Sequence, residues 1–254
     1  MSPRFSANLG FLWSELPLPD AIRRAHAVGF DAVECHWPFE FNAEAVSAAL
    51  AETGLPMLGL NTLRGDVAAG EFGLAAVPGR EKEARAGIDQ ALDYADAIGA
   101  RAVHVMAGRA GDEDVYIENL AYAAEEARDL GLSILLEPLN HRDVDDYFLC
   151  EVEQAAEIIR IVGAPNVKIM FDCYHVQIME GDLLRRIEAH LPFIGHIQIA
   201  AAPSRAEPDE GEIAFDRLIP AIYDAGYQGF VGAEYKPRGT TDAGLGWLSA
   251  MRGT

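Results

Sequence analysis

Polar side chains interrupt four otherwise apolar segments in the second half of the chain. Glu137 lies in SILLEPL (133–139), Asp172 in VKIMFD (167–172), Gln198 in IGHIQIA (194–200) and Glu234 in FVGAEYK (230–236). Burying such charges without partners costs several kcal/mol, so their succession indicates a shared ligand. Carboxylate and amide oxygens are hard ligands, which favour Mg²⁺ or Mn²⁺ over zinc. We therefore predict that these four residues hold a divalent metal.

Two of these residues, Glu137 and Glu234, could move a proton at a carbon next to a carbonyl. One carboxylate takes the proton and the other delivers a proton to the neighbouring carbon. The enediolate formed between these steps carries negative charge on two adjacent oxygens, which a divalent ion beside them would stabilise. The expected reaction is therefore the isomerisation of a hydroxy-carbonyl compound.

Further polar residues lie close to these glutamates in the sequence. His175 and His196 fall among the predicted metal ligands and could contact substrate oxygens. An acidic substrate would need a cation, and Arg205 and Lys236 are the candidates. We therefore predict that these four residues bind substrate.

The elements that must position these residues alternate regularly along the chain. Predicted strands cover 5–9, 32–37, 56–61, 102–108, 133–139, 167–172, 194–200 and 230–236. Most are nearly continuous apolar runs, which are typical of parallel strands buried on both faces. Predicted helices cover 17–30, 42–55, 79–100, 112–132, 150–163, 178–191, 213–226 and 241–251. Glycines that end several of these helices, such as Gly54 and Gly99, indicate C-terminal caps with positive φ.

Eight strand–helix units in 254 residues predict a (β/α)8 TIM barrel, formed as one domain over 1–254. An open, doubly wound sheet is the alternative. In a barrel, strands five and eight face each other, so Glu137 and Glu234 would meet across the mouth. The long loops 62–79 and 201–212 follow strands and would lie at the same mouth, where long loops are usually functional.

Other residues near the mouth have more than one possible role. His36 follows the second predicted strand and is left open, whereas His104 is equally consistent with a core histidine. Aromatic residues after the first two strands are expected to roof the pocket and to contribute to a homo-oligomer. These residues are Phe11, Trp13, Trp37, Phe39 and Phe41, together with Leu12 and Pro38.

The composition excludes several classes of partner. The formal net charge is −20, with 20 basic and 40 acidic residues. Such a surface disfavours nucleic acid and anionic membranes, because affinity for phosphate backbones comes from basic residues. No apolar run approaches the roughly 18 residues of a membrane span. The cysteines, Cys35, Cys150 and Cys173, lack C-x-x-C spacing, so we expect a reducing, cytoplasmic location.

The whole chain, including the polar residues described above, resembles the hydroxypyruvate isomerase family. That family lies within the sugar isomerases and epimerases related to xylose isomerase and endonuclease IV. The matching segments are FSANLGFLWSELP, GFDAVE, HVMAG, LEPLN, FDCYHVQIMEGDL, HIQIA, EPDEGEIAF, GFVGAEYKP and GLGWL. The resemblance implies that Glu137 and Glu234 transfer protons and that Asp172 and Gln198 complete a metal site with them. In related epimerases a histidine stands where this chain has Gln198.

The resemblance also implies a substrate. Hydroxypyruvate, converted to tartronate semialdehyde, is the leading expectation, and a four-carbon 2-oxo acid (2-oxo-tetronate) or a free ketose is the alternative. A phosphodiesterase like endonuclease IV would need more histidine ligands and a basic groove. A non-catalytic sugar-acid binding protein would keep the pocket but would not need two opposed glutamates.

Overall fold

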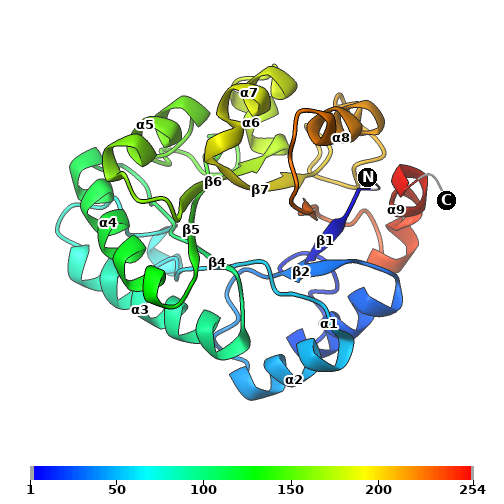
Figure 1. Ribbon diagram of the computed structural model, residues 1–254, viewed down its shortest axis with the longest axis horizontal. Helices are drawn as coiled ribbons and strands as arrows, with labels where there is room; N and C mark the ends of the chain where they lie inside the picture. Colours follow the sequence, from blue (N-terminus) through cyan, green and yellow to red (C-terminus); the bar gives the residue numbers. More distant parts are fainter. Residues whose placement is uncertain (1–2, 253–254) are drawn as a thin grey trace.

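Eight parallel strands form a closed barrel in the computed structural model, which describes residues 3–252 (Figure 1). The strands are β1 (Phe5–Asn8), β2 (Ala32–Glu34), β3 (Leu60–Asn61), β4 (Ala102–His104), β5 (Ser133–Leu136), β6 (Val167–Asp172), β7 (Ile194–Ile199) and β8 (Val231–Ala233). Their order in the sheet is β2-β1-β8-β7-β6-β5-β4-β3. Backbone hydrogen bonds from Val33 to Pro56 and from Leu58 to Val33, 3.0 and 2.7 Å long, close the ring. The predicted TIM barrel is confirmed, and the open sheet is wrong.

The helices surround the strands on the outside of the barrel (Figure 1). They are α1 (Leu18–Ala27), α2 (Ala43–Thr53), α3 (Glu81–Ile98), α4 (Glu113–Asp129), α5 (Val152–Val162), α6 (Cys173–Met179), α7 (Leu183–His190), α8 (Phe215–Asp224) and α9 (Gly246–Arg252). Short 3₁₀ turns are η1 (Val67–Ala69), η2 (Leu191–Phe193) and η3 (Thr241–Gly244). None of the helices within residues 3–252 is long and apolar enough to cross a membrane.

Two of the predicted helices have different boundaries in the structure. The segment predicted as a helix over 178–191 is broken between α6 and α7, where Gly181 and Asp182 have φ of 67° and 52°. Positive φ cannot continue a right-handed helix, so the chain turns there. The segment 241–251 likewise divides into η3 and α9. Elsewhere the capping signals hold, since Asn42 caps α2 through the backbone N–H of Ala45 and Gly54 ends it with φ of 71°.

The core lies between the strands and the surrounding helices. In α3 the buried positions include Ala84, Ile88, Ala91 and Ala95, spaced so that one face of the helix packs on the barrel. Helix α9 packs against β1, where the rings of Trp247 and Phe5 lie 5.3 Å apart, edge to face. These contacts fix the strands whose carboxyl ends carry the polar residues.

Candidate active site

A cavity of 490 Å³ opens at the carboxyl ends of the strands, as expected for a barrel of this type. Glu137 follows β5, Glu234 follows β8, and His175 and Arg205 come from α6 and from the loop after β7. The other lining residues are Gly10, Phe11, His36, Trp37, Asn61, Arg64, Phe72, His104, Met106, Leu139, Arg142, Asp143, Val144 and Lys236. The two predicted catalytic glutamates therefore share one cavity.

Aromatic residues form part of the cavity wall. Phe11 and Trp37 line the cavity, in the position predicted for a roof. Leu12 and Trp13 do not fit that prediction, because they are 0% and 2% exposed and pack into the hydrophobic core.

A buried acidic group lies at the base of this site. Atoms of Glu137, Asp172 and His175 that could ligate a metal all lie within 4.8 Å of one another. Asp172 is paired in register with Gln198 on the neighbouring strand β7. Arg205 Nη2 lies 3.9 Å from Asp172 Oδ2 and 3.7 Å from Glu234 Oε1. The structure thus brings the four predicted metal ligands into one region of the barrel.

Each of these four residues has a buried oxygen without a hydrogen-bond partner among the described residues. The atoms are Glu137 Oε1, Asp172 Oδ2, Gln198 Oε1 and Glu234 Oε2. Buried polar atoms are normally satisfied, so these four free oxygens indicate a missing ligand. Three carboxylates and an amide oxygen match the preferences of Mg²⁺ and Mn²⁺. The donor set therefore fits a divalent cation.

His175 is close enough to serve as a ligand, but its hydrogen bonds favour another role. The backbone N–H and the side-chain amide of Asn140 lie 2.9 and 2.7 Å from His175 Nδ1. Burial lowers the pKa of His175 well below its ordinary value, so the ring is neutral. Because Nδ1 accepts these hydrogen bonds, the single ring proton lies on Nε2. Nε2 is 3.6 Å from Asp172 Oδ2, too far for a hydrogen bond, so its N–H is free to donate to a substrate oxygen as predicted.

The two glutamates have opposite electrostatic surroundings. Burial, followed by the charges of Glu234 and Asp172, raises the pKa of Glu137 well above its usual range. Burial opposes ionisation of Glu234 as well, but the hydrogen bond from His36 and the charge of Arg205 hold the pKa of Glu234 below its usual value. His36 Nε2 lies 2.8 Å from Glu234 Oε1. The surroundings of the two glutamates at this cavity thus shift their pKa values in opposite directions.

Arg205 is surrounded by acidic and aromatic groups. Its guanidinium donates to Asp143 Oδ2 at 3.0 Å and lies 5.0 Å from the centres of the Phe11 and Tyr174 rings. Burial alone would lower the pKa of Arg205, but Glu234 and Asp172 raise it. The backbone of Arg205 has φ of 56°, and its carbonyl accepts the N–H of Lys236 at 2.7 Å. The loop after β7 is therefore fixed against the end of β8.

Three other cationic residues line the cavity without an acidic partner. No carboxylate within residues 3–252 forms an ion pair with the side chains of Arg64, Arg142 or Lys236. The guanidinium carbon of Arg64 lies 3.9 Å from the centre of the Trp37 ring, a cation–π contact. In a chain with a net charge of −20, unpaired cations at one cavity indicate an anionic ligand. Lys236 was predicted for this role, whereas Arg64 was not.

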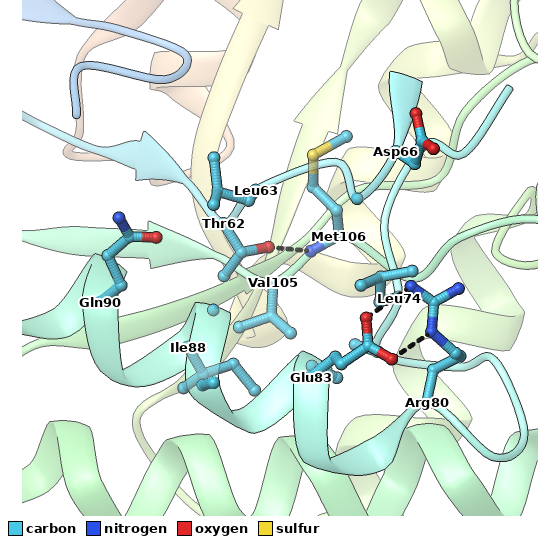
Figure 2. A pocket seen from close by; sticks show the side chains of 15 residues that line it. Thr62, Leu63, Asp66, Leu74, Arg80, Glu83, Ile88, Gln90, Val105 and Met106 are labelled. Carbon is cyan, nitrogen blue, oxygen red and sulfur yellow. Dashed lines mark hydrogen bonds and ion pairs between the residues drawn. The ribbon is translucent and has the colours of Figure 1, made fainter. Parts of the chain in front are cut away.

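The loop that carries Arg64 is held in place by contacts on its outer side. A second cavity, of 450 Å³, lies between this loop and α3 (Figure 2). Figure 2 shows two hydrogen bonds beside this cavity. The backbone N–H of Met106 donates to Thr62 Oγ1 at 3.1 Å, and the Arg80 side chain donates to Glu83. Arg80 also pairs with Glu71, which accepts the backbone N–H of Asp66 at 2.6 Å. The N–H of Gly73 donates to the carbonyl of Arg64 at 2.8 Å.

His196 was predicted to contact substrate, but it does not line the catalytic cavity in the described part of the chain. It lies two residues before Gln198 in β7, about 6.6 Å further along the strand from its carboxyl end. There His196 Nε2 is 2.5 Å from Glu34 Oε2. His196 therefore contacts Glu34 instead of lining the cavity.

Sequence reasoning gave no role to Glu34 and left His36 open. Glu34 ends β2, and His36 lies two residues further along the chain. Their spacing would have identified both residues, because they interrupt an apolar segment with a period of two. The same signal identified the polar residues of the last four strands.

Comparison with known proteins places the chain in a family. Residues 22–251 match the model of the xylose isomerase-like TIM barrel. A 2-oxo-tetronate isomerase from Cupriavidus necator is 45% identical over 258 residues, which cover 99% of both chains. A hydroxypyruvate isomerase from Escherichia coli is 40% identical over 256 residues, which cover 98% of this chain and 99% of the relative.

A solved structure gives the same result at the level of the fold. The crystal structure of an AP endonuclease, family 2, from Brucella melitensis superposes with a TM-score of 0.94. The two chains are 41% identical, and the match covers 98% of each. The barrel and its connections are therefore shared over nearly the whole chain.

Proposed function

The chain belongs to the xylose isomerase-like TIM-barrel family and, within it, to the hydroxypyruvate isomerase family, and we propose that it interconverts hydroxypyruvate and tartronate semialdehyde. The observation that carries this proposal is that Glu137 and Glu234 line one cavity, in surroundings that shift their pKa values in opposite directions. Groups whose environments push their pKa values apart are suited to act as base and acid.

Glu234 acts as the base in the direction that consumes hydroxypyruvate. Its carboxylate takes a proton from C3, the carbon that carries the hydroxyl group, and leaves an enediolate. Glu137 then delivers its proton to C2. The hydroxyl proton passes from O3 to O2, and exchange with solvent returns both glutamates to their starting states. In the reverse direction the two glutamates exchange roles.

Neighbouring side chains hold the substrate and its developing charge. The Nε2–H of His175 donates to a substrate oxygen, since Asn140 occupies the other ring nitrogen. Glu137, Asp172, Gln198 and Glu234 would hold a divalent cation, Mg²⁺ or Mn²⁺, whose positive charge would stabilise the enediolate oxygens. Arg205 holds Glu234 ionised and adds positive charge near the same oxygens.

The cationic side chains without an acidic partner bind the substrate carboxylate. Arg64 and Lys236 lie on the cavity wall, and Arg205 is already engaged with Asp143, Asp172 and Glu234. A guanidinium group can bind a carboxylate with two parallel hydrogen bonds, whereas an ammonium group acts as a compact charge. The substrate is therefore a hydroxy-oxo acid in preference to a neutral ketose.

The four-carbon alternative, 2-oxo-tetronate, shares the same reacting atoms. The 45% sequence identity to the Cupriavidus necator 2-oxo-tetronate isomerase supports 2-oxo-tetronate as a second candidate substrate beside hydroxypyruvate. A cavity of 490 Å³ also leaves room for one further carbon. A phosphodiesterase is disfavoured by the acidic chain, and a binding protein would have no use for the opposed pKa values of Glu137 and Glu234.

The test is isomerisation in deuterated solvent with hydroxypyruvate, 2-oxo-tetronate and a neutral ketose. We expect turnover of one of the two acids in the presence of Mg²⁺ or Mn²⁺, with solvent deuterium incorporated at C2 of the aldehyde product. A protein that binds these acids but neither isomerises them nor exchanges their protons would be a binding protein. Turnover of the neutral ketose alone would overturn the acid as substrate.

A further inference from the structure

Glu34, His196 and Gln198 meet inside the barrel although Glu34 comes from a distant part of the chain. Glu34 Oε2 lies 2.5 Å from His196 Nε2, and Gln198 Nε2 donates to Glu34 Oε1 at 3.4 Å. Their exposed fractions are 4%, 6% and 2%, so all three side chains are buried. Strands β1 and β8 separate β2 from β7 in the sheet. The side chain of Glu34 therefore crosses the barrel interior to reach β7.

A glycine provides the space for this crossing. Gly232 on β8 is paired in register with Gln198. A Cβ atom at Gly232 would lie 2.4 Å from Glu34 Oε1 and 2.8 Å from His196 Nε2, closer than van der Waals contact permits. A larger residue at Gly232 would therefore push first against Glu34 Oε1, the atom that accepts the hydrogen bond from Gln198.

The contact with Glu34 determines which end of the Gln198 amide faces the site. The amide turns its NH₂ group toward Glu34 Oε1, which accepts the hydrogen bond from Gln198 Nε2. Gln198 Oε1 is then left buried without a partner among the described residues. An amide that rotated by 180° would present N–H groups on the side where Gln198 now presents its free oxygen, and N–H groups repel a cation.

We propose that Glu34 is a positioning residue that fixes the Gln198 amide with its oxygen toward the divalent cation. The inference rests on the proposed function, because it assumes the metal site described above. Glu34 touches neither substrate nor cation in this arrangement and acts through Gln198. Partners that orient metal ligands commonly contribute about 10- to 100-fold to metal affinity.

The test is a double-mutant cycle on Mn²⁺ affinity, with free Mn²⁺ followed by electron paramagnetic resonance. E34Q and Q198A should each weaken Mn²⁺ binding by at least about tenfold. In the Q198A background, E34Q should change the affinity by less than about twofold, because the amide that Glu34 orients is gone. Independent, additive losses would overturn the positioning role.

A control and a second variant distinguish this role from a general loss of structure. E207Q removes another carboxylate that is 1% exposed and binds the backbone N–H of Arg238 outside the cavity, and it should leave Mn²⁺ affinity unchanged. G232A keeps every ligand but displaces Glu34, so it should weaken Mn²⁺ binding as E34Q does. Unchanged affinity in G232A would overturn the inference.

The outcomes separate this inference from the proposed function. If wild-type protein binds Mn²⁺ and isomerises its substrate while E34Q retains full affinity, the positioning role fails and the proposed function stands. If wild-type protein binds no Mn²⁺, the metal site fails and the positioning role fails with it. Melting temperatures measured in EDTA report whether each variant is folded.

Discussion

His36 Nε2 lies 2.8 Å from Glu234 Oε1 and joins the ends of β2 and β8, which β1 separates in the sheet. This hydrogen bond and the charge of Arg205 outweigh burial and hold the pKa of Glu234 low. Glu137 has no such partner for Oε1, and burial raises its pKa. The difference between the two glutamates therefore originates in their hydrogen-bond partners.

Removing His36 should shift the pH dependence of the reaction. In H36A the pKa of Glu234 should rise, because the hydrogen bond that favours its ionised form is lost. The base is active when ionised, so the acidic limb of kcat/KM should move to higher pH by roughly one unit. The pH–rate profile measures the shift, with H26A, a change of an exposed histidine, as the control. An unmoved acidic limb would contradict this account of Glu234.

Replacing either glutamate with glutamine should separate proton transfer from binding. E137Q and E234Q keep the side-chain shape and a carbonyl oxygen but lose the ionisable group. Each should reduce kcat by at least about 10²-fold, the usual contribution of a general acid or base. Proton exchange distinguishes the roles, since E137Q should still exchange the C3 proton of hydroxypyruvate with deuterium whereas E234Q should not. Near-normal turnover by the double variant would rule out the glutamate pair.

Without metal, the buried charge of Asp172 should destabilise the folded protein. Burial raises the pKa of Asp172 from 3.8 to about 7, so the folded chain holds a proton that the unfolded chain has lost. Stability from this group is therefore lost as pH rises from about 4 to about 7 in metal-free protein. D172N has no such charge, and in EDTA it should melt at a higher temperature than wild-type protein at pH 7. The difference should shrink at pH 5.

Adding metal should reverse that order. At a concentration 100 times its Kd, Mn²⁺ should stabilise wild-type protein by about 2.7 kcal/mol, or roughly 5–10 °C in Tm. The increase in Tm on adding Mn²⁺ should be smaller at pH 5, where protons compete for the carboxylates. It should be smaller still in D172N. Differential scanning calorimetry measures both effects. An equal increase in wild-type and D172N protein would place the metal elsewhere.

The sequence predicted the barrel well because its signals were local. Glycines with positive φ end α2, α3 and α5, and strands buried on both faces give continuous apolar runs. The break at Gly181 and Asp182 was missed, since a glycine within a helical pattern does not by itself show that the next residue also leaves the helix. Single-domain organisation, a homo-oligomer and a cytoplasmic location stay predictions.

The site was predicted only in part because its remaining contacts join distant segments. Glu137 and Glu234 were found from polar interruptions of single strands. The pairing of Glu34 with His196 joins residues 162 positions apart, and no local pattern shows which histidine faces the cavity. The contact of Arg64 with Trp37 depends on how two loops pack, which no local pattern specifies.

Arg64 provides the most direct test of the substrate class. Its guanidinium stacks on Trp37 at the cavity wall and has no carboxylate partner within residues 3–252. R64Q keeps a polar side chain but removes the guanidinium group and its charge, and a hydrogen bond to a charged group contributes about 1.5–3 kcal/mol. KM for hydroxypyruvate should therefore rise by about 10- to 100-fold while kcat changes little, because the carboxylate itself gains and loses no proton in the reaction.

Dihydroxyacetone, a neutral compound with the same hydroxy-ketone group, makes this test specific. Its turnover should be slow in wild-type protein and should not decrease further in R64Q, so the preference for the acid should fall. R217Q, which removes an exposed arginine on α8, should change neither substrate's kinetics. An equal loss of kcat/KM for both compounds in R64Q would mean that Arg64 supports the cavity wall. Carboxylate recognition would then fall to Lys236 and Arg142, the other unpaired cations of the cavity.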